Sequence, residues 1–230
     1  MLKNIYIIMI SLNEYVKESL LSGFDEIELS TDPKKEIIKF INDNYTINGK
    51  FKISNKPNKR GKYVVDCIEV SVNNNKITSL TNGMFEWGVV KGYFNCYGCQ
   101  SLTSLEGAPK KVDGYFNCTR CNSLKTLEGA PKVVGENFMC DYCKSLTSLK
   151  GAPEEVDGNF SCSLCDSLKS LEGAPEKVMG DFQCFSCKSL TSLKGAPKEV
   201  GGDFDCVYCG TQWGIKDIKA ISKIKGNIFL

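Results

Sequence analysis

The sequence repeats every 22 residues from residue 101 to residue 210. Full copies follow one another without gaps, from SLTSLEGAPKKVDGYFNCTRCN to SLTSLKGAPKEVGGDFDCVYCG. Residues 79–100 form a degenerate copy that keeps the Gly-Tyr-Phe-x-Cys-x-x-Cys end and lacks Gly-Ala-Pro. A strict period of this length predicts a stacked solenoid, in which each unit buries its apolar side only against its neighbours.

Every copy keeps the same apolar positions, which in the first full copy are Leu102, Leu105, Ala108, Pro109, Val112, Phe116, Cys118 and Cys121. The Phe-x-Cys alternation predicts a short strand with one buried face. Gly107 and Gly114 stand where so short a coil must turn sharply, and Pro109 favours an extended path. On the return side we expect only extended or one-turn segments.

This pattern resembles the leucine-rich repeat in its short bacterial form. Phe116 and Cys118 match the two strand leucines of that repeat, and Cys121 matches the Asn/Cys position that turns the chain. The Leu-x-x-Leu-x-x-Ala-Pro-x-x-Val run is similar to secreted bacterial effector repeats, and Cys-x-Ser-Leu-Thr-Ser-Leu is similar to BspA-like repeats. Gly-Ala-Pro coils of this kind are familiar from tailed phages and gut bacteria. The resemblance covers about residues 70–210 and implies an α+β fold, a leucine-rich-repeat solenoid of about six 22-residue coils.

Both ends change character, because a solenoid needs caps over its terminal coils. The expected segments are an N-terminal helical cap (1–56), transition strands (57–78), leucine-rich repeats (79–210) and a C-terminal cap (211–230).

Helices are expected in both caps. The N-terminal cap is predicted to contain helices over 11–22 and 32–45, the second with an apolar face made of Ile37, Ile38, Phe40 and Ile41. KFKIS and KYVVDCIEVSV alternate as strands. The C-terminal cap is predicted to be a helix over 214–225, with Ile215, Ile218, Ile221 and Ile224 on one stripe, followed by a strand in GNIFL.

Each of the six copies carries a Cys-x-x-Cys pair, and two such pairs with an 18-residue spacer match a four-cysteine zinc site. Each first cysteine, however, shares the inward face of its phenylalanine, and the pattern lacks the coil-by-coil pairing that a zinc site would leave. We therefore expect buried cysteine ladders and no cofactor, with metal binding or a thiol function as the alternatives. So many free thiols indicate a reducing, cytoplasmic location, which is the host cytoplasm for a phage-encoded chain.

Residues beside the Phe-x-Cys positions are predicted to line the exposed face of the sheet. This face runs from tyrosine-rich to acidic, and its candidate partner-binding residues are Tyr93, Asn95, Tyr97, Tyr115, Asn117, Arg120, Asp141, Tyr142, Asp181, Phe185, Asp203, Asp205 and Tyr208. Exposed Tyr and Arg are typical of protein interfaces. The same residues also suit a merely solvated sheet face, because Tyr is a good strand former.

Composition narrows the function classes. The chain has no histidine and a formal charge of +2, which lowers the expectation of hydrolase or metal chemistry and of nucleic-acid binding. The apolar start, MLKNIYIIMISL, has no small-residue cleavage site after it, so we interpret it as the first structural element. We expect a non-enzymatic protein-binding module with no membrane association, and the phage-like coils suggest a host or defence component as partner. The alternatives are a structural, virion-associated solenoid and a zinc- or thiol-dependent protein.

Overall fold

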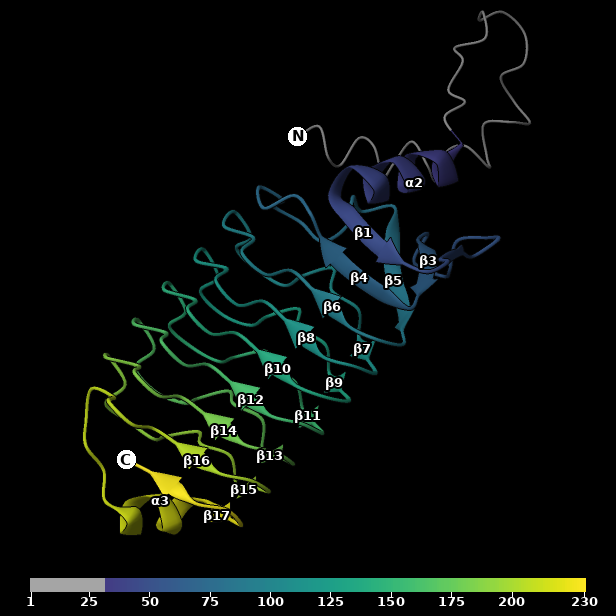
Figure 1. The fold of residues 1–230 in the computed structure, drawn as a ribbon. Helices are drawn as coiled ribbons and strands as arrows, with labels where there is room; N and C mark the ends of the chain where they lie inside the picture. Colours follow the sequence, from purple (N-terminus) through teal and green to yellow (C-terminus); the bar gives the residue numbers. More distant parts are fainter. Residues whose placement is uncertain (1–31) are drawn as a thin grey trace, which may run out of the picture. The chain divides into compact units, whose positions relative to one another are not determined.

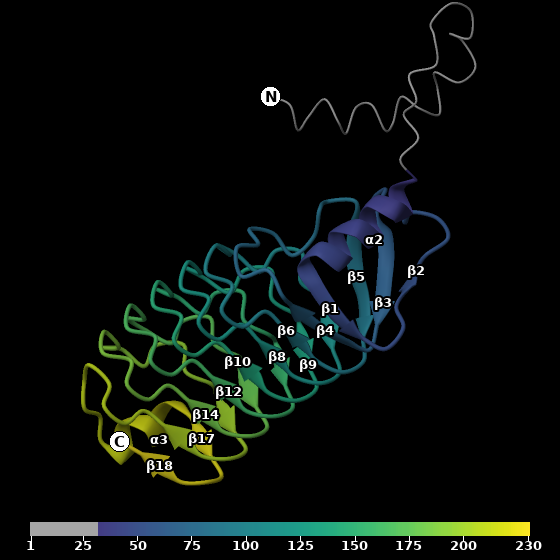
Figure 2. The same cartoon turned by 45° about the horizontal axis from the view of Figure 1, so that its top comes forward.

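The computed structural model describes residues 32–230, of which Pro33–Leu230 form one compact unit. In this unit the chain winds into a β-solenoid of about eight coils (Figure 1). Each coil contributes a short strand to each of two sheets (Figure 2). Both sheets bury side chains in one hydrophobic core.

The first sheet is called here the Phe sheet, because its strands from β6 to β16 begin with phenylalanine. Its strands are, in order, β1 (Tyr45–Asn48), β4 (Glu69–Val72), β6 (Phe94–Asn95), β8 (Phe116–Asn117), β10 (Phe138–Met139), β12 (Phe160–Ser161), β14 (Phe182–Gln183), β16 (Phe204–Asp205) and β18 (Ile228–Phe229).

The second sheet is called the Val sheet, because its strands from β5 to β15 end with valine. Its strands are β2 (Lys52–Ile53), β3 (Tyr63–Cys67), β5 (Phe85–Val90), β7 (Lys111–Val112), β9 (Val133–Val134), β11 (Glu155–Val156), β13 (Lys177–Val178), β15 (Glu199–Val200) and β17 (Lys223–Ile224). These strands lie on the return side of the coil, where extended segments are predicted.

Equivalent residues of successive coils lie side by side. Phe116 pairs with Phe94 and Phe138 in parallel register, and its ring stacks on theirs at centroid distances of 5.5 and 5.3 Å. Val112 pairs with Val90 and Val134 in the Val sheet. The 22-residue period of the sequence is thus the offset between hydrogen-bonded neighbours.

The cysteines point into the core, as their position in the repeat predicts. All thirteen lie within the described residues and have reduced thiols, and all but Cys209 are buried. The second cysteine of a pair donates its thiol to the carbonyl of the first cysteine one coil earlier, as from Cys121 to Cys96 at 3.1 Å and from Cys143 to Cys118 at 3.3 Å. This repeated S–H···O contact gives a physical reason for cysteine at a position where an alkyl group would leave the carbonyl with fewer partners.

Two turns close each coil. Gly107 has φ of +89°, a left-handed conformation that glycine adopts at little cost. Gly114 has no such φ, but an added Cβ would lie 2.7 Å from the Gly92 carbonyl carbon of the preceding coil. The predicted sharp turns are therefore present at both glycines, the first for conformation and the second for close approach.

The N-terminal end of the solenoid is covered by helix α2 (Pro33–Asn44), close to the predicted helix over 32–45 (Figures 1 and 2). Ile37 and Ile41 are buried, but Ile38 is 39% exposed, so its assignment to the apolar face is wrong. Ile38 lies one residue from Ile37, about 100° around the helix, and so leaves the buried stripe. The other predicted helix, over 11–22, lies outside the described residues.

Antiparallel pairing starts each sheet. Strand β1 pairs with β4, and β2 pairs with β3, whereas the later strands pair in parallel. The predicted alternating strands in KFKIS and KYVVDCIEVSV are confirmed as β2, β3 and β4.

The C-terminal end differs from the predicted long helix. Helix α3 (Ile215–Ile221) stops early, and Ser222 leaves it in an extended conformation. Only Ile218 of the predicted stripe is fully buried, whereas Ile215 and Ile221 are exposed. Ile224 lies in β17, which pairs with β15, and the predicted final strand is confirmed as β18.

The coil count exceeds the predicted value of about six. Strands β3 and β4 already form one coil in the segment expected to be a transition, and β17 and β18 form another in the expected cap. The predicted repeat solenoid with short strands is confirmed, and the expected α+β mixture reduces in the described residues to a β-solenoid with two helices.

Candidate partner-binding face

The outer face of the Phe sheet carries four rows of side chains, and each coil adds one residue to each row. The row before the phenylalanines contains Tyr93, Tyr115, Asn137, Asn159, Asp181 and Asp203. The row after them contains Asn95, Asn117, Met139, Ser161, Gln183 and Asp205. The row after the first cysteines contains Tyr97, Thr119, Asp141, Ser163, Phe185 and Val207. The last row contains Gly98, Arg120, Tyr142, Leu164, Ser186 and Tyr208, and is called the turn row.

Tyr93 and Tyr115 form an ordered aromatic pair near the N-terminal end. Their rings stack at 4.9 Å with planes 10° apart. Asn48 Nδ2 donates to the Tyr93 hydroxyl at 2.8 Å and to Glu69 Oε2 at 3.0 Å. Partial burial is the main cause that raises the pKa of Tyr115, so its hydroxyl stays protonated at neutral pH. These contacts hold the two rings in a fixed arrangement.

Arg120 lies between two tyrosines of the neighbouring coils. Its guanidinium carbon is 5.9 Å from the Tyr97 ring centroid and 5.2 Å from that of Tyr142. Each such cation–π contact at an exposed site contributes about 0.5–1 kcal/mol. Tyr97 is 48% exposed and Tyr142 38% exposed, so this sandwich forms a raised aromatic and cationic patch.

The turn row has left-handed backbone. Arg120, Tyr142 and Tyr208 have φ of 61, 55 and 58°, a conformation that costs a residue with a Cβ about 1–2 kcal/mol. Gly98 stands at the same position with φ of 71°, where glycine makes the cost disappear. Large side chains are therefore present at positions where the backbone favours glycine.

The Asn and Asp residues that follow the phenylalanines have a structural role. Asn95 Oδ1 accepts the Tyr97 N–H at 3.0 Å, and Asn117 Oδ1 accepts the Thr119 N–H at 2.9 Å. Asp205 Oδ1 does the same for Val207 at 3.0 Å. These are Asx turns, which bend the chain after the strand.

The predicted acidic end is also partly structural. Asp181 Oδ1 accepts the Asp203 N–H at 2.9 Å, and Asp203 Oδ1 accepts the Asn227 N–H of the next coil at 2.6 Å. Asn137 and Asn159 form the earlier steps of the same ladder. Each carboxylate thus satisfies a backbone donor of the following coil, which accounts for Asp or Asn at this position without a partner.

Asp141 does not point outward as a free carboxylate. Its Oδ1 accepts the Ser163 N–H at 2.8 Å and also the Ser161 hydroxyl. Both serines are buried, and burial raises the pKa of Asp141. The three residues form a closed polar cluster in the middle of the face, so the prediction that Asp141 contacts a partner is not supported by its hydrogen bonds.

The C-terminal part of the face carries Phe185 and Tyr208. Phe185 is half-buried, whereas Tyr208 is 82% exposed. Tyr208 is therefore the most accessible aromatic residue of the predicted set.

The opposite side of the solenoid carries paired charges. Lys132 Nζ contacts Glu154 Oε1 at 2.9 Å, and Lys198 Nζ contacts Glu176 Oε1 at 2.8 Å, each across neighbouring coils. Exposed pairs of this kind contribute about 0–1 kcal/mol each. Their side chains pair with each other, as expected for a mixed-sign solvated surface.

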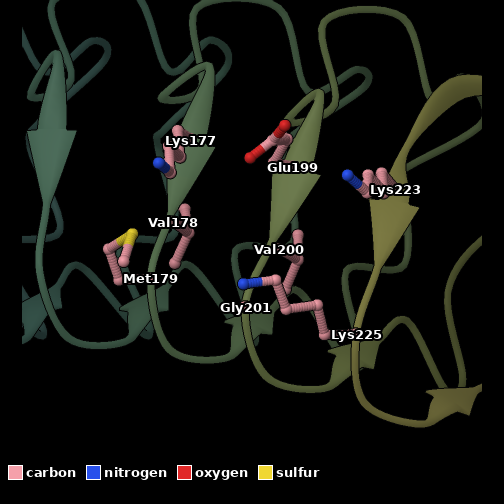
Figure 3. Close-up of a pocket in the computed structure, with 8 residues that line it drawn as sticks. All are labelled: Lys177, Val178, Met179, Glu199, Val200, Gly201, Lys223 and Lys225. Carbon is pink, nitrogen blue, oxygen red and sulfur yellow. The ribbon is translucent and has the colours of Figure 1, made fainter.

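Hollows on this side are small or open. Figure 3 shows Lys177, Glu199 and Lys223 on adjacent strands of the Val sheet, beside a hollow of about 10 Å³. That volume is about the space of one water, far below a typical ligand site. A larger hollow of about 450 Å³ along Lys219–Ile224 is open to solvent.

The cysteine pairs offer no preformed metal centre in the part of the chain that the structure describes. No group of three or more Cys, Asp or Glu residues there has the arrangement to hold a metal ion. The thiols of Cys118 and Cys140 donate to backbone carbonyls instead. Burial is the main cause that raises the pKa of both thiols.

Sequence reasoning missed three residues of this face. Asn48 lies on β1, 45 residues before Tyr93, and no repeat signal connects the two. Leu164 and Ser186 complete the turn row, and the signal that identifies them is their 22-residue spacing from Tyr142.

Comparison with known proteins yields no significant match to a protein-family model, a curated protein or a solved structure. Neither α2 nor α3, the helices of residues 32–230, has the length and apolarity that crossing a membrane requires.

Proposed function

We propose that this protein is a non-enzymatic protein-binding module whose contact surface is the outer face of the Phe sheet. The observation that carries the proposal is the Arg120 sandwich between Tyr97 and Tyr142. Tyr and Arg dominate interface hot spots because they combine large contact area with directional polar groups.

Preorganisation supports binding by this face. Arg120 is held by two rings, and Tyr93 is held by stacking and by Asn48. Ordering a flexible side chain at an interface costs about 0.5–1.5 kcal/mol. Side chains that are already ordered avoid most of that cost.

Backbone strain in the turn row supports the same conclusion. The left-handed backbone at Arg120, Tyr142 and Tyr208 lowers the free energy of unfolding, whereas glycine adopts it at little cost, as Gly98 does at the same position. Strain of this kind concentrates at functional sites, because a functional gain must offset the lost stability. Binding through the protruding side chains is such a gain.

The partner is proposed to be a protein. The C-terminal end of the face carries Asp181, Asp203 and Asp205, which would repel nucleic-acid phosphates. For a phage-encoded chain acting in the host cytoplasm, the partner would be a host or defence component.

Glycine substitutions allow a test that spares the fold. Arg120→Gly with Tyr142→Gly removes two candidate contacts and relaxes two left-handed residues, so the variant should be at least as stable as the wild type. The matched control is Lys132→Ala with Glu154→Ala on the opposite side. Each protein is immobilised and exposed to lysate of the natural host, and captured proteins are quantified by mass spectrometry.

A protein captured by the wild type and the control, and lost from the glycine variant, supports the proposal. Equal capture by all three proteins would contradict a role for this face, because the variant keeps the fold and lacks only the protruding side chains.

We also propose that the coils are a short form of the leucine-rich repeat. Phe116 in β8 and Cys118 directly after it have fully buried side chains, and the Cys121 thiol hydrogen-bonds to the preceding coil from the turn. The repeat consensus accepts asparagine at the Cys121 position. Accordingly, Cys143→Asn should keep cooperative unfolding, whereas Cys140→Asn, which buries an amide beside the phenylalanine ladder, should abolish it. Equal effects of the two changes would contradict the assignment.

A further inference from the structure

The C-terminal coil leaves the Val sheet with an open edge. Strand β17 is the last strand in the order of that sheet. The Lys223 and Lys225 amides donate to carbonyls of the preceding coil, at 2.8 and 3.0 Å. Backbone groups of successive strand residues point alternately to the two sides of a strand, so the N–H and C=O of Ile224 point to the side without a neighbouring strand in residues 32–230. This edge can accept one more strand.

The side chains at this edge lack the cover that the inner coils have. Val178 and Val200, which occupy the position equivalent to Ile224, are 0 and 1% exposed, whereas Ile224 is half-buried. Ile221, just before β17, is exposed. Ser222 is buried, and its hydroxyl has no hydrogen-bond partner among the residues that the structure describes. A further strand could supply both an apolar cover and a polar partner here.

A row of alternating charge ends at the same edge. Along the Val sheet, Lys177 pairs with Glu199, and Glu199 pairs with Lys223, as Figure 3 shows for these adjacent strands. Neighbouring residues of opposite charge stabilise a sheet, and like charges oppose strand pairing. A strand that continues this row should therefore carry an acidic residue beside Lys223. Lys225 favours a second acidic residue two positions later.

A segment outside the described residues carries this pattern. Residues 24–29 read FDEIEL, which alternates charged and apolar residues as β17 and Lys225 do, but with the opposite sign. Parallel pairing, as between β15 and β17, would set three pairs side by side: Glu26 with Lys223, Ile27 with Ile224, and Glu28 with Lys225. The same register brings Asp25 beside Ser222, where a carboxylate could accept the unpartnered hydroxyl.

The segment cannot reach the β17 edge of its own chain. Helix α2 begins at Pro33 and covers the N-terminal end of the solenoid. Strand β3 lies at that end, and seven strand spacings, about 34 Å in all, separate it from β17. Glu28 lies five residues before Pro33, and five residues extend over at most about 18 Å. The strand that fits the edge must therefore come from a second copy.

We propose that residues 24–29 of one copy add a parallel strand to β17 of a second copy, so that the chains assemble head to tail. The backbone of Ile224 gains hydrogen bonds, Ile27 covers the Ile224 side chain, and two ion pairs set the register. The contact is heterologous, because different surfaces of the two copies meet, and such contacts can continue into open chains. It does not involve the outer face of the Phe sheet.

A direct junction of the two sheet ends is the less favourable arrangement. It would place β2 of one copy against β17 of another, and so bring Lys52 close to the lysines of β17. Like charges on neighbouring strands destabilise their pairing. The acidic segment avoids this repulsion.

Charge reversal tests the contact, with sedimentation velocity of the full chain over micromolar concentrations as the measurement. The wild type should form larger species as its concentration rises. Glu26→Lys with Glu28→Lys should raise the dissociation constant at least about tenfold, because like charges then meet at two positions. This variant leaves residues 32–230 unchanged. The matched control, Glu14→Lys with Glu18→Lys, makes the same change of charge in the same terminal segment and should assemble like the wild type.

A second pair of substitutions tests the other side of the contact. Lys223→Glu with Lys225→Glu should also prevent self-assembly. An equimolar mixture of the two charge-reversed proteins should assemble again, because each supplies the charges that the other requires. The matched control, Lys216→Glu with Lys219→Glu, changes the charge of α3 at the same end and should leave assembly unchanged.

Cross-linking with a carbodiimide, which joins carboxylates directly to amines, locates the contact. Isotope-labelled and unlabelled wild type are mixed first, so a cross-linked pair with one labelled peptide comes from two copies. Trypsin does not cleave after a cross-linked lysine, so Lys223 appears in peptide 220–225 and Lys225 in peptide 224–230. Fragmentation of the partner peptide, 18–34, should place Glu26 on Lys223 and Glu28 on Lys225.

Three results would each overturn the proposal. They are a wild type that stays monomeric, assembly that persists after Glu26→Lys with Glu28→Lys, and cross-links that join Glu26 to Lys225 or that occur only within one copy. The wild type and the Glu26/Glu28 variant decide the question even if the β17 variant folds poorly.

Discussion

Replacing left-handed glycines by alanine separates two costs that this solenoid combines at its turns. Gly98 has φ of +71°, and an added Cβ would meet nothing within 4 Å. Gly151 has φ of +89°, and an added Cβ would lie 2.6 Å from the Glu128 Cα of the preceding coil. Gly107 has the same φ, but its nearest neighbour is the Thr81 side chain at 3.2 Å, which can move.

The magnitudes follow from these contacts. Gly98→Ala meets only the left-handed penalty of about 1–2 kcal/mol. Gly151→Ala adds overpacking against backbone, which costs about a further 1–3 kcal/mol. The total for Gly151→Ala is therefore about 2–5 kcal/mol, the sum of the two costs. Gly107→Ala should fall between the other two.

Urea unfolding followed by circular dichroism measures the three free energies of unfolding, and hydrogen exchange locates the coil that loosens. The expected order of destabilisation is Gly98→Ala, then Gly107→Ala, then Gly151→Ala. Equal losses at Gly98 and Gly151 would refute the reasoning, because the two positions share a left-handed φ and differ in the backbone contact.

Three further predictions concern the core and the polar clusters. Phe138→Ala, which removes a fully buried ring, should lower the free energy of unfolding by about 3–5 kcal/mol in the same urea assay. Asp141→Asn should stabilise the protein at neutral pH: the raised pKa means that the wild type loses stability as pH rises from the ordinary value of 3.8 through the folded-state value. Thermal melts at several pH values should show the gain vanish below the ordinary value. Tyr45→Phe and Trp87→Phe each remove one of two donors to the Leu80 carbonyl, at 2.8 and 3.1 Å. In a double-mutant cycle, the double variant should lose more free energy of unfolding than the two single variants together, because only the double variant leaves the buried Leu80 carbonyl without both donors.

The repeat core was predictable because each interior coil meets two nearly identical neighbours. The inward positions of Phe116, Cys118, Cys121 and Leu102 follow from one coil and apply to all, and each of these side chains is fully buried. The Phe-x-Cys alternation indicates which side chains point inward, and the 22-residue period indicates which residue of the next coil each one contacts.

The ends were less predictable because they occur once. Ile215, Ile218, Ile221 and Ile224 recur at a spacing that suits a helical stripe, but the chain leaves the helix at Ser222 so that Lys223–Ile224 can pair with Glu199–Val200. Hydrogen bonding to β15, at the edge of the Val sheet, decides the conformation of Lys223–Ile224. The spacing of the isoleucines carries no information about that edge.

The face was predictable in direction and less so in chemistry. Alternation identifies the exposed position of Tyr97, and the predicted edge of the face contains the exposed Tyr142 and Tyr208. It does not reveal that Asp141 turns to Ser163, or that Asp203 accepts an amide of the next coil, because both contacts depend on neighbouring coils. The left-handed φ of the turn row has no signal in Arg120 itself.

The uniform register makes the number of coils adjustable. Since Phe116, Phe138 and Phe160 pair at the same 22-residue offset, removing or duplicating one whole unit would leave every buried contact with an equivalent partner. An insertion or deletion of 22 residues at equivalent positions would therefore add or remove one whole coil. Each event would move Tyr208 relative to Tyr97 by one strand spacing, about 4.8 Å. The distance between the exposed Tyr97 and Tyr208 can therefore change in fixed steps of one coil while the fold stays the same.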